Sequence, residues 1–178
     1  LSHMILLGLL TFAGTAGTSG FTDATGTSAK FNNPRSIICD NAGVNLYVAD
    51  HTNYRIRKIV ISTGAVTTLA GSGVNGDSDG TGTAAQFSFP RGITIDSTDT
   101  NVYVLSNTKM RKIVVDTGVV TTLATITGAK RGLTIDNSNE YLYFPKDSNH
   151  IIARLKLSDN SVTTFAGADG SSGNTNGS

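Results

Sequence analysis

The feature that most constrains this chain is a short phrase that returns along its length. Thr-(Phe/Leu)-Ala-Gly begins at Thr11, Thr68 and Thr164, and a partial copy begins at Thr122. Successive copies are 57, 54 and 42 residues apart, and the later copies close runs of β-branched residues. Self-similarity at this spacing indicates supersecondary units that cannot bury their hydrophobic faces without neighbours. The chain is therefore expected to consist of one unit written several times.

Each unit has the same internal order. Arg, then alternating apolar residues, then Asp recur at 35–40, 91–96 and 131–136. Three further runs rich in Val, Ile, Thr, Tyr and Leu follow, separated by polar turns, and together they predict four short strands per unit. The predicted strands lie at 37–40, 46–49, 55–61 and 65–70, at 93–96, 102–105, 109–115 and 119–124, and at 133–136, 142–144, 151–157 and 161–166. No window has a convincing 3.6-residue period, so essentially no helix is expected.

Four short strands joined by tight turns predict an antiparallel meander. Ile93 and Ile95 point to one face of their strand and Thr94 to the other, so both faces combine apolar and small polar residues. Such a sheet is typical of a blade stacked between two others around a channel. The predicted fold is all-β, a β-propeller built of four-stranded antiparallel blades, with about three blades in this chain.

The repeat predicts the organisation of the chain and its association. Residues 1–4 resemble a cloning remnant. The remaining segments are predicted to be an orphan outer strand and long loop (5–30), the first blade (31–70), a long loop and the second blade (71–124), the third blade (125–166) and a truncated loop (167–178). Three blades do not close a ring, and an open arc has unpaired edges that favour association. A homodimer, or a longer parent chain, is therefore expected to complete a ring of six blades.

Taken together, these residues resemble an NHL repeat of the long-loop variety. Pro90-Arg91-Gly92-Ile93 with Asp96 matches the lead-in of that pattern, and Tyr47-Val48-Ala49-Asp50 with Asn53-Tyr54-Arg55-Ile56 matches its second and third strands. The third copy departs from it, with Leu142-Tyr143-Phe144-Pro145-Lys146 and no long loop. The resemblance implies a six-bladed propeller that serves as a protein- or RNA-binding platform, while neighbouring propeller families include lactonases and a lyase with a channel metal. A fold does not carry its function with it.

Composition excludes several classes. The chain has 178 residues, a net charge of +1 and 15% charged residues, which argues against a nucleic-acid partner. No apolar stretch reaches the ~18–20 residues that span a membrane. The single cysteine, Cys39, excludes an internal disulfide and a Cys-based zinc cluster, and its alignment with Ile95 and Ile135 predicts a buried apolar role. Abundant Ser, Thr, Gly and Asn are more typical of an extracellular or cell-surface protein.

Three arginines form the first candidate binding site. Arg35, Arg91 and Arg131 each stand just before the first strand of a unit. In a propeller this position lies near one mouth of the channel, where three guanidinium groups could bind an anion or carboxylate. The alternative is structural: each Arg pairs with an Asp or a loop carbonyl of its own blade.

The second candidate lies in the long loop before the second blade. Asn75-Gly76-Asp77-Ser78-Asp79-Gly80 has the oxygen spacing of the first half of a calcium loop, but its twelfth position is Gln86 and not Glu. Asp79 has a counterpart in Asp23, which indicates a structural role for that pair. Asn75 and Asp77 remain as candidate binding residues, and no metal or other cofactor is predicted.

Other recurrent polar residues are expected to have structural or solvent-exposed roles. Asp residues that follow each first strand should accept backbone N–H groups in the next turn. Arginines of the third strands are expected at solvated or blade-edge positions, and histidines of the turns in exposed loops. The residues concerned are Asp40, Asp96 and Asp136, Arg57, Arg111 and Arg154, and His51 and His150.

Three functional hypotheses follow. The preferred one is a non-enzymatic scaffold that binds a protein or small ligand through the long loops 15–30 and 72–86. A metal-dependent propeller enzyme would need Glu, Asp, Asn or His at the start of the first strand, where this chain has Arg and Ser or Gly. An RNA-binding surface would need a basic face with exposed aromatics, whereas this chain has no Trp.

Overall fold

The computed structural model describes residues 11–129, 131–170 and 173. Its strands form antiparallel sheets that follow the predicted units in chain order. The first sheet is β1 (Pro34–Cys39), β2 (Asn45–Asp50), β3 (Arg55–Val60) and β4 (Ala65–Ala70). The second is β6 (Pro90–Ile95), β7 (Asn101–Ser106), β8 (Lys109–Val114) and β9 (Val119–Thr125), with the two-residue β5 (Gly80–Thr81) added beside β9. The third is β10 (Thr134–Ile135), β11 (Tyr141–Lys146), β12 (Ile151–Lys156) and β13 (Val162–Ala166).

The predicted all-β fold of four-stranded antiparallel blades is confirmed. In the described part of the chain the helical residues form short 3₁₀ turns: η1 (Gly26–Ser28), η2 (His51–Asn53), η3 (Gly82–Ala84) and η4 (Asp147–Asn149). None of the helices described is long and apolar enough to cross a bilayer. The recurring Thr-(Phe/Leu)-Ala phrase forms the end of each fourth strand, as the repeat predicts.

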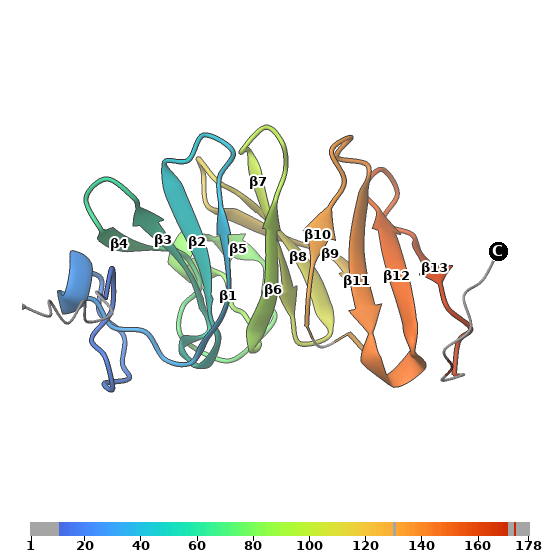
Figure 1. Cartoon of the computed structure of the whole chain (residues 1–178), viewed down its shortest axis with the longest axis horizontal. Helices are drawn as coiled ribbons and strands as arrows, with labels where there is room; N and C mark the ends of the chain where they lie inside the picture. The colour runs from blue at the N-terminus through green and yellow to red at the C-terminus, as the bar shows by residue number, and fades with distance from the viewer. Residues whose placement is uncertain (1–10, 130, 171–172, 174–178) are drawn as a thin grey trace, which may run out of the picture.

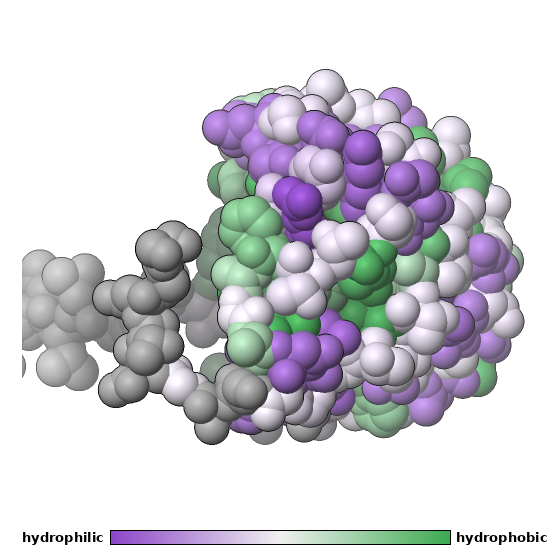
Figure 2. Space-filling view, turned by 90° about the vertical axis from the view of Figure 1, so that its right-hand side faces the viewer, coloured by the Kyte–Doolittle hydropathy of each residue, from purple (hydrophilic) through white to green (hydrophobic). Residues whose placement is uncertain are grey.

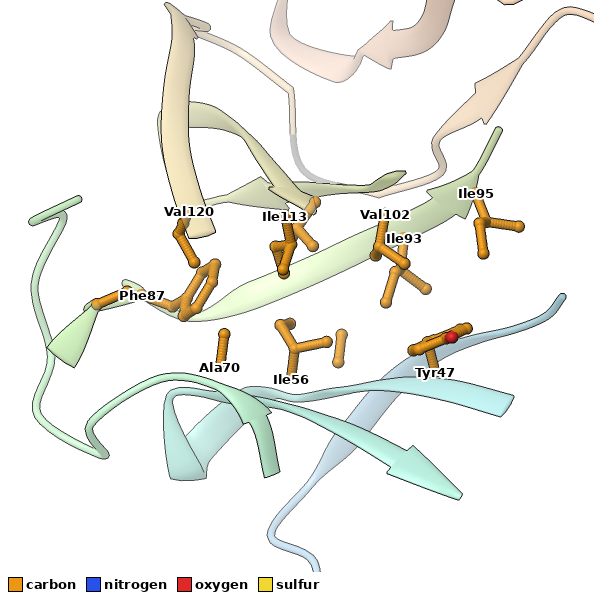
Figure 3. Close-up of a cluster of buried hydrophobic side chains, with 12 residues drawn as sticks. Tyr47, Ile56, Ala70, Phe87, Ile93, Ile95, Val102, Ile113 and Val120 are labelled. Carbon is orange, nitrogen blue, oxygen red and sulfur yellow. The ribbon is translucent and has the colours of Figure 1, made fainter. Parts of the chain in front are cut away.

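The three sheets stand side by side in an arc (Figure 1). The first strand of the middle sheet, β6, contacts β1 and β2 on one side and β10 on the other, so the first strands of the three sheets are neighbours. Apolar side chains fill the space between sheets. Figure 3 shows the cluster between the first two, where Tyr47, Ile56 and Ala70 face Phe87, Ile93 and Val120. A second cluster, which includes Leu105, Met110, Leu142 and Phe144, joins the middle sheet to the third.

The outer faces of the arc leave apolar residues uncovered. Ile37 is 57% exposed in the first sheet, whereas Ile93, at the equivalent place in the middle sheet, is 3% exposed. Cys39 shares the uncovered face and is exposed, so the prediction of a buried Cys39 is wrong. Its counterpart Ile95 is buried because the first sheet packs against the middle one. At the opposite end, Figure 2 shows apolar side chains among polar ones on the face of the third sheet.

Two predicted terminal segments lie mostly outside the residues that the structure describes. The orphan outer strand expected near 5–13 lies mostly outside the described residues, and Thr11, Phe12 and Ala13 are not in a strand. Most of the tail 167–178 also lies outside them.

Candidate anion-binding site at the starts of the inner strands

Arg35, Arg91 and Arg131 line one cavity. Its volume is about 530 Å³, and its other lining residues are Ser36, His51 and Gly132. Arg35 and Arg91 are the second residues of β1 and β6, and Arg131 stands three residues before β10. Because β6 is flanked by β1 and β10, the starts of three strands converge, and the predicted meeting of the three arginines is present in the structure.

Local irregularities place these side chains. The ladder between β1 and β2 shifts register between Pro34 and Ser36, so Arg35 lies in a bulge. The ladder between β6 and β7 shifts between Pro90 and Ile93, a segment that contains Arg91. Bulges bend a strand locally and re-aim its side chains.

Close backbone packing brings the starts of the middle and third sheets together. A Cβ atom added to Gly92 would lie 3.0 Å from Leu133 Cβ and 3.3 Å from the Gly132 backbone. Gly92 therefore allows the segment after Arg91 to pack closely against the segment after Arg131. This contact explains why a glycine follows Arg91 where Ser36 follows Arg35.

The three guanidinium groups have no acidic partner in the described part of the molecule. Ion pairs there involve Arg57, Arg111 and Lys156, and no side-chain hydrogen bond joins Arg35, Arg91 or Arg131 to another described residue. The lining of the cavity includes no Asp or Glu. Three cationic groups around one cavity, without a carboxylate among its lining residues, form a site suited to anions.

His51 is a member of the site that the sequence prediction missed. It was expected in an exposed loop, but it is 7% exposed, so that prediction is wrong. The turn η2 folds its ring against Phe89, with ring centroids 5.2 Å apart, and its Nδ1 lies 3.1 Å from the Pro90 carbonyl oxygen. The neighbouring sheet therefore covers a turn that its own sheet would leave open. His150 is exposed, as expected.

The environment of His51 favours the neutral ring. Burial lowers the pKa of His51 below its ordinary value, and the charges of Arg35 and Arg91 lower it further. The hydrogen bond with the Pro90 carbonyl acts to raise the pKa of His51, and the Phe89 carbonyl raises it by a smaller amount. A carbonyl oxygen only accepts, so Nδ1 carries the hydrogen of the neutral ring and Nε2 is an acceptor.

Arg57 and Arg111 have structural roles that differ from the prediction. Both were expected at solvated or edge positions, but both side chains are fully buried. Arg57 donates to Asp50 at 2.8 Å and to Asp23 at 2.6 Å, and it also donates to the carbonyls of Thr22 and Lys30. Buried charges require such pairing.

The middle sheet repeats this arrangement with one partner changed. Arg111 donates to Asp79 at 2.9 Å and to the carbonyls of Gln86 and Ser78. Ser106 takes the place of Asp50, and its hydroxyl accepts the backbone N–H of Ser88. Burial lowers the pKa of Arg111, although Asp79 opposes this.

The third sheet lacks this buried pair. Its register places Ala153 opposite Phe144, whereas Arg57 and Arg111 lie opposite Val48 and Val104. Arg154 is therefore one position further along its strand and corresponds to Lys58, so its predicted alignment with Arg57 is wrong. Lys146 occupies the position of Asp50.

Asn75 and Asp77 are exposed and are not among the residues that line the arginine cavity. The neighbouring Asp79 is engaged by Arg111 and by the N–H and hydroxyl of Thr122, as Asp23 is by Arg57 and Thr68, which confirms the structural role predicted for that pair. No group of three or more His, Cys, Asp or Glu that could hold a metal ion occurs within the residues described.

The aspartates after the first strands act as predicted. Asp40 accepts the backbone N–H groups of Val44 and Asn45. Asp96 accepts the N–H of Thr100, and Asp136 that of Glu140. Burial acts to raise the pKa of Asp40, but its hydrogen bonds from Asn45 and Val44 outweigh burial and hold that pKa below its ordinary value.

Comparisons with known proteins bear on the fold. No family model matches the chain. Over 76 residues, 43% of this chain, the sequence is 37% identical to Protein SUPPRESSOR OF QUENCHING 1, chloroplastic, from Arabidopsis thaliana, of which the match covers 7%.

Solved structures similar to this chain include propeller proteins. A chain of the nidogen/laminin complex aligns with a TM-score of 0.59 and 20% identity over 78% of this chain and 50% of its own length. Virginiamycin B lyase from Staphylococcus aureus aligns with a TM-score of 0.55 and 20% identity over 74% of this chain and 40% of its own. The chain thus spans about half the length, or less, of these proteins. The likeness shows the fold, an arc of propeller blades.

Proposed function

We propose that this chain is a non-enzymatic binding module of the NHL-type propeller class. It recognises an acidic group of a partner protein or small ligand at the cavity formed by the starts of β1, β6 and β10. The observation that carries the proposal is the convergence of Arg35, Arg91 and Arg131 on one cavity whose lining has no carboxylate. Guanidinium groups bind carboxylates and phosphates in a bidentate manner, and the strand starts fix the backbone positions from which the three side chains extend.

The contacts of the long loops favour this site over the loops themselves. Ser72 and Gln86 donate backbone hydrogen bonds to Ala85 and Ser78, and β5 pairs with β9. The loop is thus bonded to itself, and its residues 78–81 pair with β9 and bind Arg111. Its exposed tip, with Asn75 and Asp77, is proposed as a second contact surface.

The composition of the cavity supports binding without catalysis. Its lining contains one residue suited to act as a base, His51, and no Asp or Glu to orient that base. A metal-dependent lyase-like enzyme remains the alternative because virginiamycin B lyase has a similar fold. Retention of divalent metal by the purified chain would support that alternative.

Titration of the ¹⁵N-labelled chain with hexaglutamate tests the proposal. Shifts are expected at amides of β1, β6 and η2, and hexalysine should cause none. The double variant Arg35→Ala/Arg91→Ala should lose the shifts, whereas Arg154→Ala, which removes an arginine outside the cavity, should keep them. Shifts confined to 72–86, or no shifts at millimolar hexaglutamate, would reject the arginine site.

A further inference from the structure

The cavity presents both donors and an acceptor. Arg35, Arg91 and Arg131 supply N–H donors from three separate strand starts, and His51 lies between the first two sheets on the same cavity. Since Nδ1 of His51 donates to the Pro90 carbonyl, its Nε2 has a lone pair for an incoming hydrogen. No hydrogen bond joins Nε2 to another of the described residues.

Size and polarity restrict the ligand. A cavity of about 530 Å³ falls within the range that encloses a small molecule. An apolar ligand would leave the guanidinium groups without partners, and a single carboxylate would satisfy at most one or two of them. An anion without a hydroxyl has no donor to offer to the lone pair of Nε2.

We infer that the cavity binds a small hydroxylated polyacid, with its acid groups on Arg35, Arg91 and Arg131 and its hydroxyl donating to Nε2 of His51. This inference rests on the proposed function, because it names the ligand class of the same site. The shared chemistry is two or more acid groups on a short skeleton that also carries a hydroxyl. Carboxylate and phosphate forms of such a ligand are the two sources to be distinguished.

Citrate and tricarballylate form a matched pair of probes, since the two differ by one hydroxyl group. Calorimetric titration of the wild-type chain should show that citrate binds about threefold to tenfold more tightly than tricarballylate, the range expected for one hydrogen bond. Glycerol 1,3-bisphosphate, which carries two phosphates and one free hydroxyl, serves as the phosphate arm. Tighter binding of glycerol 1,3-bisphosphate than of citrate would overturn the polycarboxylate form.

Substitutions separate the roles of the lining residues. His51→Asn keeps an amide N–H that can donate to Pro90 but has no atom at the position of Nε2, so it should reduce citrate binding to the level of tricarballylate and leave tricarballylate unchanged. Arg91→Ala should weaken both ligands at least tenfold, and Arg154→Ala should weaken neither. Unchanged amide spectra away from the cavity would show that each variant is folded.

The outcomes distinguish this inference from the proposed function. Equal affinity for citrate and tricarballylate, or a preference for citrate that survives in His51→Asn, would overturn the role of His51. If hexaglutamate binds at the cavity while citrate does not, the ligand class is wrong and the proposed function stands. If neither binds, both fail.

Discussion

At the scale of single residues, arginine serves two different purposes in this chain. Arg57 and Arg111 are buried between a sheet and its long loop, and each binds at least one carboxylate. Arg35, Arg91 and Arg131 surround a cavity without one. The first group stabilises the blades, and the second is available to a ligand.

Removal of Arg57 should destabilise the fold strongly. Arg57→Ala leaves Asp50, which is fully buried, without its cation, and loss of one member of a buried pair costs about 3–5 kcal/mol. Arg111→Ala should cost less, because its partner Asp79 is half-exposed. Urea denaturation measures both, with Lys58→Ala on the same strand as control. Equal losses for Arg57→Ala and Lys58→Ala would contradict the role of the buried pair.

The free energy of unfolding should decrease as the pH is lowered, because His51 becomes protonated. Its pKa in the folded chain is below the ordinary value of 6.5, so the unfolded chain binds the proton first as pH falls. The contribution of the neutral ring is complete above about pH 6.5 and is lost progressively below it. Thermal melting between pH 7.5 and 5 should show a steeper decline for the wild type than for His51→Asn. Parallel profiles would show that His51 is not linked to folding.

At the scale of elements, the recurring phrase has a steric cause. Gly71 has φ +110°, and a Cβ there would lie 2.5 Å from the Tyr54 carbonyl oxygen. Gly167 repeats the contact with His150, at 2.8 Å. Tyr54 and His150 are themselves left-handed residues at the turn before the third strand. The glycine thus allows the end of the fourth strand to pass over this turn.

Two glycine variants separate backbone strain from collision. Gly71→Ala combines a positive φ with a clash against backbone, while Gly43 has φ +68° and open space around its Cβ position. We expect Gly43→Ala to cost about 1 kcal/mol and Gly71→Ala at least about 3 kcal/mol in urea unfolding. Similar values for the two would show that the contact with Tyr54 is relaxed without cost.

Local patterns predicted the strands and turns, because those depend on neighbours in sequence. The alternation in β6 and the aspartate that closes the next turn are both readable without the fold. Cys39, His51 and Arg57 were misjudged because their burial depends on which sheet or loop lies beside them. The convergence of the three arginines was predictable only because the repeat places each at the same point of its blade.

At the scale of the whole molecule, the two end faces of the arc resemble the buried faces between its sheets. Ile152 is 41% exposed, whereas Ile56 and Met110, its counterparts by register, are fully buried. Ile37 differs from Ile93 in the same way. Among the described residues, each end therefore exposes side chains whose counterparts are buried between blades, and such faces favour association.

A second copy of this chain can cover both ends at once, and we predict that it does. If the first sheet of one copy packs on the third sheet of the other, a two-fold axis generates a second, identical contact and closes the arc into a ring. Because both contacts contain the same residues, Ile37→Asp or Ile152→Asp should each disrupt both and weaken dimerisation at least tenfold. Val74→Asp, which alters an exposed valine of the long loop, should not. Light scattering across a dilution series should give twice the chain mass for the wild type and Val74→Asp, and the single-chain mass for the other two. A wild-type chain that stays monomeric and soluble at every concentration would contradict ring closure by a second copy.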